Sequence, residues 1–367
     1  MLKKSDFVIT SKQLIFIIIG CMVTTVNYNL PQVTSTEVGQ DAWIPVIIGG
    51  LVPLFSIFMI ERLHRNFPTQ SFVQMTFLIF GKWLGNVIIL SFILYIICLQ
   101  AIVLRICSEI TTTFILPQTP IWALSLLFII VSGYVAIKGA KVVGRMNEFL
   151  FYLSLIALIM IILPVFEHSN LTNLLPVAEA DISDLVLAAR VTLYSYFGVE
   201  ILFLIYSMVT RKDEVLKAAF TGITITISFY IIVVLACLLV FGAETMQALI
   251  WPVMILLKVI NIPVFERLEL FFLVICMSVG IRAIFNFGFA ASFSIADLLN
   301  KIKLYPYIIV GYCLFVYIGA QIPENIIEIL NWAYYGGYLF LFFGIGYPIL
   351  YHVVYGIRKE KVMKGVQ

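Results

Sequence analysis

Two charged residues, Glu200 and Arg282, lie inside long apolar stretches of the chain. A charged side chain at the centre of a membrane helix costs about 2.5–3.5 kcal/mol on insertion scales, so each needs a compensating partner. Either the two side chains form a buried ion pair, or Arg282 receives an anionic group of a ligand. Because intramembrane carboxylates also occur in proton relays, Glu200 has a second possible role in ion coupling. Asn286, one helical turn beyond Arg282, can reach the same face.

Polar residues and glycine interrupt two of the apolar stretches. Inside a bilayer, unwound backbone persists only where protein, water or a ligand satisfies its N–H and C=O groups. The ends of half-helices also present backbone dipoles that attract charged groups such as carboxylates. A merely kinked helix packed with aromatic side chains is the alternative interpretation of the second stretch. The interrupting residues are Thr24, Thr25, Asn27, Asn29 and Pro31 in residues 13–34, and Tyr194, Ser195, Tyr196, Phe197, Gly198 and Glu200 in residues 185–209.

The sequence carries no signature of a catalytic nucleophile, a metal site or a phosphate-binding loop. Its cysteines lack the CxxC spacing of metal sites, and burial as small apolar residues is the simpler interpretation. Its histidines occur singly near the ends of apolar stretches. We therefore expect no enzymatic activity, no metal and no cofactor. These residues are Cys21, Cys98, Cys107, Cys237, Cys276, Cys313, His64, His168 and His352.

Composition indicates an integral membrane protein. Hydrophobic residues make up 62% of the chain and charged residues 12%, and the mean hydropathy is +1.08. A soluble domain has about 45–50% apolar and about 25% charged residues. A helix needs about 20 apolar residues to cross a bilayer core of about 30 Å. Stretches of this kind predict ten membrane helices near residues 13–34, 43–60, 84–104, 121–137, 149–166, 185–209, 218–241, 268–296, 305–322 and 333–355.

The distribution of charge between the stretches predicts the orientation. Cytoplasmic loops near the membrane retain lysine and arginine, and most of the 23 basic residues fall on one predicted side. Both termini are therefore expected in the cytoplasm. The formal net charge of +3 averages two opposed faces and gives no indication of nucleic-acid binding. The basic side carries Lys3, Lys4, Lys12, Arg62, Arg65, Lys82, Lys138, Lys141, Arg145, Arg211, Lys212, Lys217, Lys301, Lys303, Arg358, Lys359, Lys361 and Lys364.

The number of spans predicts an internal repeat. Five crossings invert the second unit relative to the first, which is the arrangement of the LeuT-type 5+5 inverted-repeat fold, whose helices 1 and 6 are broken at the substrate site. We therefore expect an all-α integral membrane protein with one domain over residues 1–367. Its repeats would cover about 12–166 and 185–355, and residues 356–367 would form a cytoplasmic tail.

Several motifs in the same order and spacing resemble the endospore germination permease family, the GerAB-type B subunits of spore nutrient receptors. The resemblance runs from about residue 8 to residue 357. It rests on the order of the motifs along the chain, because no single motif is diagnostic. The motifs are Gly39-Gln40-Asp41-Ala42-Trp43, Gly81-Lys82-Trp83-Leu84-Gly85, Asn173-Leu174-Leu175-Pro176-Val177, Ser195-Tyr196-Phe197-Gly198-Val199-Glu200, and Leu249-Ile250-Trp251-Pro252 followed by Glu266-Arg267-Leu268-Glu269.

This resemblance implies a fold of the amino acid/polyamine/organocation superfamily. It implies a protein of the inner spore membrane that binds a small-molecule germinant, often an amino acid. The implied partners are a membrane A subunit and a lipoprotein C subunit. Carried over by position, the germinant pocket would be lined by Thr24, Thr25, Val26, Leu99, Phe197, Gly198, Arg282 and Ala283, to which the sequence adds the hydroxyl of Ser195.

The chain departs from the family pattern at two places. Many relatives have Gly-x-Gly at the first interruption, where this chain has Thr24-Thr25-Val26, and small or polar residues where it has Arg282. Our hypothesis is that the threonine hydroxyls contact the ligand and Arg282 binds its anionic group or is neutralised by Glu200. Three functions remain open: a receptor subunit, a proton-coupled amino-acid secondary transporter, and an assembly subunit that no longer binds ligand.

Overall fold

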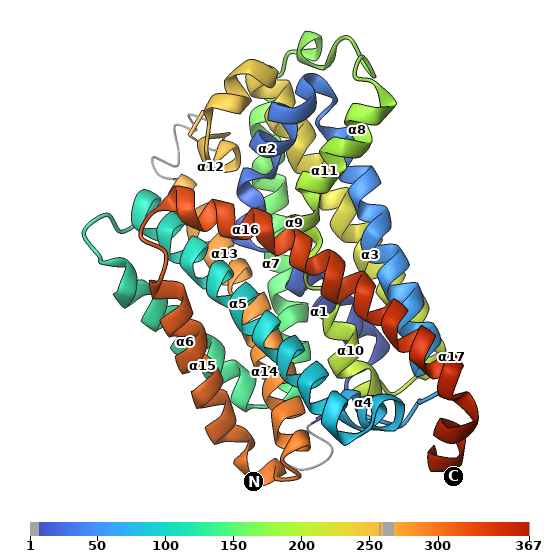
Figure 1. Ribbon diagram of the computed structural model, residues 1–367. Helices are drawn as coiled ribbons and strands as arrows, with labels where there is room; N and C mark the ends of the chain where they lie inside the picture. The colour runs from blue at the N-terminus through green and yellow to red at the C-terminus, as the bar shows by residue number, and fades with distance from the viewer. Residues whose placement is uncertain (1–6, 257, 260–267, 367) are drawn as a thin grey trace.

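The computed structural model describes residues 7–256, 258–259 and 268–366, apart from the side chains of Val26 and of residues 268–270, 273 and 360–366. The described residues form one bundle of α-helices (Figure 1). The helices are α1 (Ser11–Met22), α2 (Leu30–Val38), α3 (Trp43–His64), α4 (Phe72–Phe80), α5 (Lys82–Phe114), α6 (Ile121–Ile137), α7 (Ala140–His168), α8 (Ile182–Ala189), α9 (Leu193–Tyr196), α10 (Ile201–Ile205), α11 (Val215–Ala248), α12 (Pro252–Leu256), α13 (Leu268–Gly280), α14 (Arg282–Leu298), α15 (Tyr305–Gln321), α16 (Ile326–Phe340) and α17 (Tyr347–Val366).

Among the described residues, eight helical segments are long and apolar enough to cross a membrane. A ninth span results if Ser11–Met22 and Asn27–Asp41, which meet at an angle of 64°, are taken together. The helix α6 is apolar but shorter. The chain is therefore a multi-pass membrane protein, while the number of ten spans stays a prediction. The eight segments are Trp43–His64, Lys82–Phe114, Ala140–His168, Ile182–Met208, Lys212–Ala248, Val274–Leu298, Ile302–Gln321 and Ile326–Lys359.

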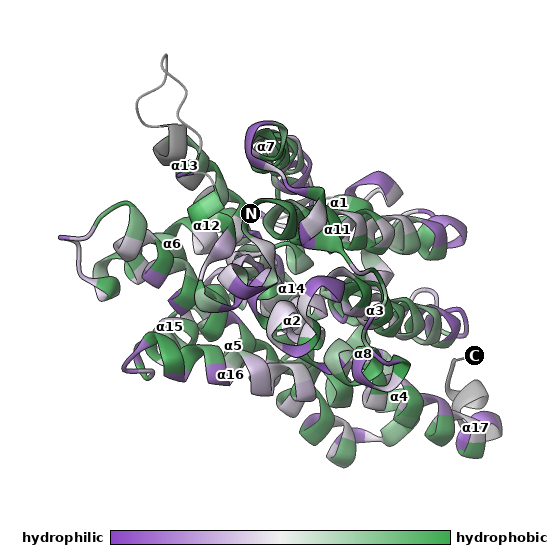
Figure 2. Ribbon diagram, turned by 90° about the horizontal axis from the view of Figure 1, so that it is seen from above, coloured by the Kyte–Doolittle hydropathy of each residue, from purple (hydrophilic) through white to green (hydrophobic). Residues whose placement is uncertain are grey.

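The helices differ in how deeply they lie in the bundle. The segments Ile182–Met208 and Val274–Leu298 are largely buried, whereas few residues of Ile302–Gln321 are buried. Seen along the bundle in Figure 2, α14 lies near the centre and the helices around it carry many hydrophobic residues. A hydrophobic outer surface suits contact with lipid tails. The second interrupted stretch thus belongs to the interior, and many residues of the first, among them Thr24 and Thr25, are buried as well, so that protein can satisfy the unwound backbone.

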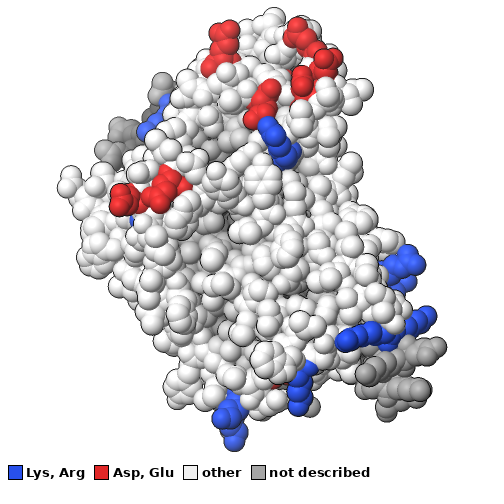
Figure 3. All heavy atoms as spheres, in the orientation of Figure 1, with Lys and Arg blue, Asp and Glu red and all other residues white. Residues whose placement is uncertain are grey.

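Charged residues separate along the bundle. On the face shown in Figure 3, most Asp and Glu side chains gather at the end near α2 and α8. Most Lys and Arg side chains on this face gather toward the opposite end, near α4 and α17. The short helix α4 begins at Ser71, whose hydroxyl accepts a hydrogen bond from the backbone N–H of Gln74 and donates one to the Asp297 carboxylate over 2.5 Å. The first bond caps the start of α4, and the second attaches α4 to the end of α14.

Asp41 fixes the loop between α7 and α8. Its carboxylate is buried and accepts backbone N–H bonds from Ala178 (2.7 Å), Glu179 (2.8 Å) and Ala180 (3.0 Å). Hydrogen bonds to an ionised acceptor are the stronger ones, worth about 1.5–3 kcal/mol each. This carboxylate therefore holds the loop against the beginning of α3.

We expect Asp41→Ala to destabilise the protein by at least about 1.5–3 kcal/mol, the value of one such bond, because it removes the common acceptor of three N–H groups. The measurement is the midpoint of thermal unfolding of the purified protein in detergent. Asp181→Ala is the matched control, since Asp181 is exposed in the same loop and makes no side-chain cap to α8. Equal midpoints for the two variants would contradict this role of Asp41.

Candidate functional site

The first interruption begins where α1 ends. Val23 and Thr24 have extended backbone conformations, with φ/ψ of −76°/92° and −126°/173°, and a 3₁₀ turn then covers Thr25–Asn29. A β-branched run of this kind has low helix propensity. Pro31 then lies in the first turn of α2, where its missing N–H costs no hydrogen bond. The chain therefore loses helical structure in the middle of an apolar stretch.

The second interruption separates α9 from α10. Phe197 is extended, and Gly198 has a φ of +120°, a conformation that L side chains rarely adopt. A Cβ atom at Gly198 would lie 2.7 Å from the carbonyl oxygen of Cys21 and 2.9 Å from its carbonyl carbon. The two interruptions are thus in backbone contact, and Gly198 permits that contact.

Tyr230 of α11 joins the two interruptions. Its hydroxyl lies 2.7 Å from the carbonyl oxygen of Met22 and 2.9 Å from that of Ser195. The same hydroxyl accepts a hydrogen bond from the Asn27 side-chain amide over 2.7 Å, and that amide also donates to Met22 O over 2.7 Å. The carbonyl of Met22, which has no helical partner because α1 ends there, is thereby hydrogen-bonded, as a low-dielectric interior requires.

Arg282 lies beside the end of α1 and is fully buried. Its Nε donates to the carbonyl oxygen of Val279 over 3.0 Å, and its Nη2 donates to that of Val23 over 3.3 Å. A cation is favourable at a helix C-terminus, where the helix dipole is negative. Its Nη1 has no hydrogen-bond partner among the described residues. One arm of the guanidinium is therefore free to bind an acceptor.

Glu200 has partners other than Arg282. It is fully buried, and its two oxygens accept hydrogen bonds from the Tyr95 hydroxyl (2.7 Å) and the Gly198 N–H (2.8 Å). No ion pair joins it to Arg282 in the part of the chain that the structure describes. Of the two alternatives from the sequence, the buried ion pair is thus not formed in this conformation, and Arg282 keeps a donor for another group.

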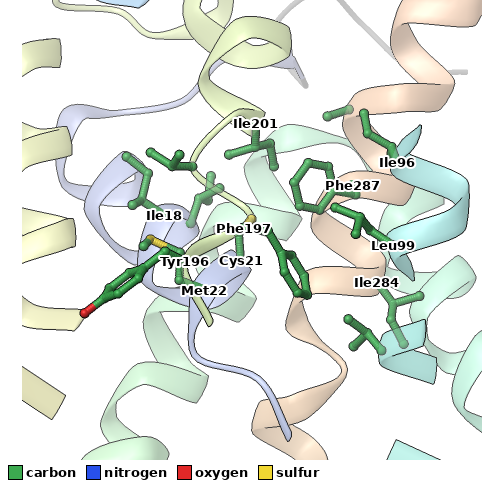
Figure 4. Packing of buried hydrophobic residues seen from close by; sticks show 14 of the residues in the cluster. Ile18, Cys21, Met22, Ile96, Leu99, Tyr196, Phe197, Ile201, Ile284 and Phe287 are labelled. Carbon is green, nitrogen blue, oxygen red and sulfur yellow. The ribbon is translucent and has the colours of Figure 1, made fainter. Parts of the chain in front are cut away.

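The hydrophobic residues predicted to line the pocket are packed together. Leu99, Phe197 and Ala283 are all buried. Figure 4 shows the Phe197 side chain pointing toward Leu99 and Ile284, whereas Tyr196 points to the opposite side. The space between these helices is therefore filled by side chains in this conformation. The lining of a ligand pocket by Leu99, Phe197 and Ala283 stays a prediction.

A small cavity of about 50 Å³ lies next to the first interruption. It is large enough for a few water molecules but too small for an amino acid without movement of its walls. Of the predicted residues, it takes in Thr24, while Val23 links it to Arg282. Its walls are formed by Val23, Thr24, Asn27, Tyr28, Leu30, Ser154, Ala157, Leu158, Ile161, Phe229, Tyr230, Val233, Val253, Cys276 and Val279. Tyr230 could not be predicted as a site residue, since nothing distinguishes a tyrosine in an apolar stretch from a packing residue.

Four buried polar atoms at the interruptions lack hydrogen-bond partners among the described residues: Thr25 Oγ1, Asn27 Oδ1, Ser195 Oγ and Arg282 Nη1. A buried polar group left unpaired costs about 1–3 kcal/mol. The set contains one cationic donor, one acceptor and two hydroxyls that can do either. It is therefore suited to a small molecule that carries both an anionic group and donor groups. The side chain of Val26 lies outside the described residues.

Asn286 pairs with Asn147 of α7. The Asn147 amide donates to Asn286 Oδ1 over 2.6 Å, and the Asn286 amide donates back to Asn147 Oδ1 over 3.1 Å. A Cβ atom at Gly20 would lie 2.1 Å from Asn147 Oδ1, so α1 approaches this pair closely because it has glycine there. The asparagine pair thus joins α7 to α14, and α1 packs closely against it.

We expect Asn286→Ala to lower stability by about 1–2 kcal/mol, as interhelical hydrogen bonds in membrane proteins do at most. Asn147→Ala should cost a similar amount, and the double variant clearly less than the sum, because both changes remove the same pair. Thermal unfolding of the four proteins in detergent measures this coupling. Strict additivity of the two effects would contradict a shared pair.

An interior built from two interrupted helical stretches in contact, within a multi-pass helical bundle, is the architecture of a transporter-type membrane protein. A solved Na⁺-coupled sialic acid symporter, in its substrate-bound outward-open state, has a similar fold: the TM-score is 0.64 at 11% identity, over 85% of this chain and 72% of that chain. The chain belongs to the spore germination protein (spore permease) family, whose model matches residues 8–329.

Named relatives cover almost the whole chain. Spore germination protein YndE of Bacillus subtilis is 29% identical over 361 residues, covering 96% of this chain and 97% of that protein. Spore germination protein A2 of Bacillus subtilis is 23% identical, covering 92% and 93%. Spore germination protein KB of the same organism is 26% identical, covering 88% of each. The resemblance predicted from the sequence motifs is confirmed, and the chain is a germination-related permease.

Proposed function

We propose that this protein is the B subunit of a spore germinant receptor and binds a small zwitterionic nutrient, an amino acid or a related compound, at the two helix interruptions. The observation that carries the proposal is the buried Nη1 donor of Arg282, which has no partner among the described residues, as is also true of oxygens of Thr25, Asn27 and Ser195 at the interruptions. A buried charge without a full set of partners is rare in a membrane interior and typically marks a functional site.

The proposed ligand matches these atoms group by group. Its carboxylate would accept from Arg282 Nη1, because guanidinium donors form strong charge-assisted bonds with carboxylates. Its ammonium group would donate to Asn27 Oδ1 and to the Thr25 and Ser195 hydroxyls. The ligand as a whole is neutral, so it brings no uncompensated charge into the membrane.

Binding requires a second conformation, because the cavity holds about 50 Å³ in this one. Movement of Phe197 away from Leu99 would enlarge the site toward the residues that the family resemblance implies. A ligand that binds only the enlarged state shifts the population toward it. In the proposed receptor, this shift is the signal passed to a membrane A subunit and a lipoprotein C subunit.

We extend the proposal to the membrane arrangement. The eight long spans, the bent pair at the first interruption and α6 together would give ten crossings. These would form a LeuT-type 5+5 inverted repeat over residues 12–166 and 185–355, with interrupted helices 1 and 6. The separation of charge along the bundle supports cytoplasmic termini, and the family supports a place in the inner spore membrane.

Germination of spores that lack the gene tests the proposal. Loss of the response to particular amino acids, restored by the wild-type gene, is the expected result. The experiment uses a panel of amino acids, sugars and salts, with spore refractility as the readout. Normal germination of the deletion strain on every nutrient would contradict a receptor function.

A proton-coupled amino-acid transporter is the second candidate, because the buried carboxylate of Glu200 has no basic partner among the described residues. Such a transporter would accumulate amino acid in proteoliposomes under an inward proton gradient, and Glu200→Gln would abolish that dependence on the gradient. For the receptor, we expect no gradient-driven uptake by either protein. Accumulation by the wild type alone would therefore favour the transporter.

A further inference from the structure

An apolar groove of about 310 Å³ lies between α6 and α13, with the end of α5 packed against both helices. Figure 2 shows α6 and α13 at the edge of the bundle, where lipid would surround them. The groove is several times larger than the small cavity beside the first interruption. Its walls are formed by Thr111, Ile115, Leu116, Leu124, Leu127, Phe128, Val131, Val274, Met277, Ser278 and Ile281. We refer to it as the lateral groove, and to the small cavity as the inner cavity.

The helix α13 separates the lateral groove from the inner cavity. With about 3.6 residues per turn, the residues that line the two spaces project from opposite sides of this helix. Cys276 and Val279 line the inner cavity, whereas the groove is lined by Val274, Met277, Ser278 and Ile281. A molecule in the groove would therefore lie across α13 from the cavity, without entering it.

The lateral groove is suited to hydrocarbon. Its two hydroxyls already have acceptors: Thr111 Oγ1 donates to the carbonyl oxygen of Cys107 (2.7 Å) or to Met277 Sδ (2.9 Å), and Ser278 Oγ donates to the carbonyl oxygen of Val274 (2.9 Å). The other lining residues are all apolar. Desolvation of a polar ligand group would be uncompensated here. An acyl chain needs no hydrogen bonds and loses none in the groove.

A lysine lies at the end of the groove where α5 stops. Lys258 follows α12, and its ammonium nitrogen lies 5.0 Å from the centre of the Phe114 ring, next to the lining residue Ile115. Lys258 is exposed, and none of the ion pairs among the described residues includes it. Lysine side chains near a membrane surface attract anionic headgroups. The groove thus combines an apolar channel with a cation at one end.

We propose that the lateral groove binds an anionic phospholipid of the surrounding membrane, with one acyl chain between α6 and α13 and the phosphate at Lys258. The lining residues 124–131 extend over about 10 Å of α6, a large part of the roughly 15 Å that one leaflet contributes to the bilayer core. The proposal goes beyond the proposed function, because it requires neither a nutrient at Arg282 nor signalling to other subunits.

Native mass spectrometry of the full-length protein in detergent tests this site. The probes are dioleoyl phosphatidylglycerol, which is anionic, and dioleoyl phosphatidylcholine, which has the same chains and a zwitterionic headgroup. We expect one phosphatidylglycerol to be retained per chain, with an affinity about fivefold higher than that of phosphatidylcholine, which corresponds to about 1 kcal/mol for one lysine. Equal affinity for the two lipids would overturn the proposal.

Leu127→Trp tests the place of the acyl chain. Leu127 lines the groove and is 54% exposed, so a larger side chain would fill the groove without disturbing the core. We expect the retained phosphatidylglycerol to be lost. Ile130→Trp is the matched control, because Ile130 of the same helix is 59% exposed and does not line the groove. Retention of the lipid by Leu127→Trp at the wild-type level would overturn the assignment to the groove.

Lys258→Gln tests the place of the headgroup. This change should remove the preference for phosphatidylglycerol over phosphatidylcholine while both lipids still bind. Lys301→Gln is the control, since it removes the same charge from an exposed position beyond the end of α14. A fivefold preference that persists in Lys258→Gln would overturn the headgroup contact.

The experiment separates this inference from the proposed function. Arg282→Ala should leave the binding of phosphatidylglycerol unchanged, because Arg282 does not line the groove. Loss of the lipid in Arg282→Ala together with its retention in Leu127→Trp would place it elsewhere and overturn the proposal. The preference for phosphatidylglycerol is measured on the purified protein, so normal germination of the deletion strain would contradict the receptor and leave the lipid site standing.

Discussion

Replacement of Gly198 by alanine is expected to cause the largest loss of folded protein among single changes at the interruptions. Two effects add. The φ of +120° at this position costs about 1–3 kcal/mol for a residue with a side chain. The new Cβ atom would also lie 2.7 Å from the carbonyl oxygen of Cys21, a backbone atom that cannot move aside by rotation of a side chain. The contact between the two interruptions would have to open.

The measurement is the level of the variant in membranes and its thermal unfolding midpoint in detergent. Gly311→Ala is the matched control, because a Cβ atom at Gly311 of α15 meets nothing within 4 Å. Alanine there should be neutral or stabilising by up to about 1 kcal/mol, as in any helix interior. A Gly198→Ala protein with a wild-type midpoint would show that the two interruptions do not depend on their close contact.

Arg282→Ala is expected to abolish the response to the nutrient while the protein remains in the membrane. A lost charge-assisted hydrogen bond of about 1.5–3 kcal/mol corresponds to a decrease in affinity of roughly 10- to 100-fold. Arg282→Lys should be nearly as impaired, because an ammonium group cannot reproduce the fork that contacts Val279 and Val23 with two nitrogens and leaves the third free.

The dependence of germination on nutrient concentration, in spores complemented with each variant, checks this expectation. Arg190→Ala is the control, since Arg190 is an exposed arginine that precedes α9 and lines neither the inner cavity nor the lateral groove. Immunoblots of spore membranes show whether each protein is present. Unchanged sensitivity in an Arg282→Ala protein that is present at the wild-type level would rule out ligand contact and favour the assembly role.

The class of the protein and the positions of the interruptions could be predicted from the sequence. Composition alone distinguishes a membrane chain from a soluble one, since lipid excludes charged residues. Thr24 and Gly198 are conspicuous because each lies in a run of polar residues within an apolar stretch, and the structure has non-helical backbone at both. Local sequence determines where a helix cannot continue.

The partners of the charged residues could not be predicted. Glu200 accepts from Tyr95, whose position relative to Glu200 depends on how two helices pack, and from the Gly198 N–H, which is free only because the helix is interrupted. Arg282 contacts backbone carbonyls, which every residue possesses and no motif marks. The packing of Phe197 against Leu99 also depends on the conformational state of the protein. The sequence is the same in every state, so it does not tell which packing a given structure has.

The hydroxyl of Tyr230 couples the two interruptions, because it contacts a carbonyl oxygen at each of them. It has a single proton and faces two carbonyl oxygens, those of Met22 and Ser195, so it can donate to only one of them at a time. Met22 O also accepts from the Asn27 amide, so it keeps a partner when the hydroxyl donates to Ser195 O. Rotation about one C–O bond therefore determines whether the Ser195 carbonyl receives the hydroxyl proton, without any movement of the backbone. The hydroxyl thereby has two possible acceptors at the contact between the two interruptions, and a group that binds the Ser195 carbonyl would favour its donation to Met22 O.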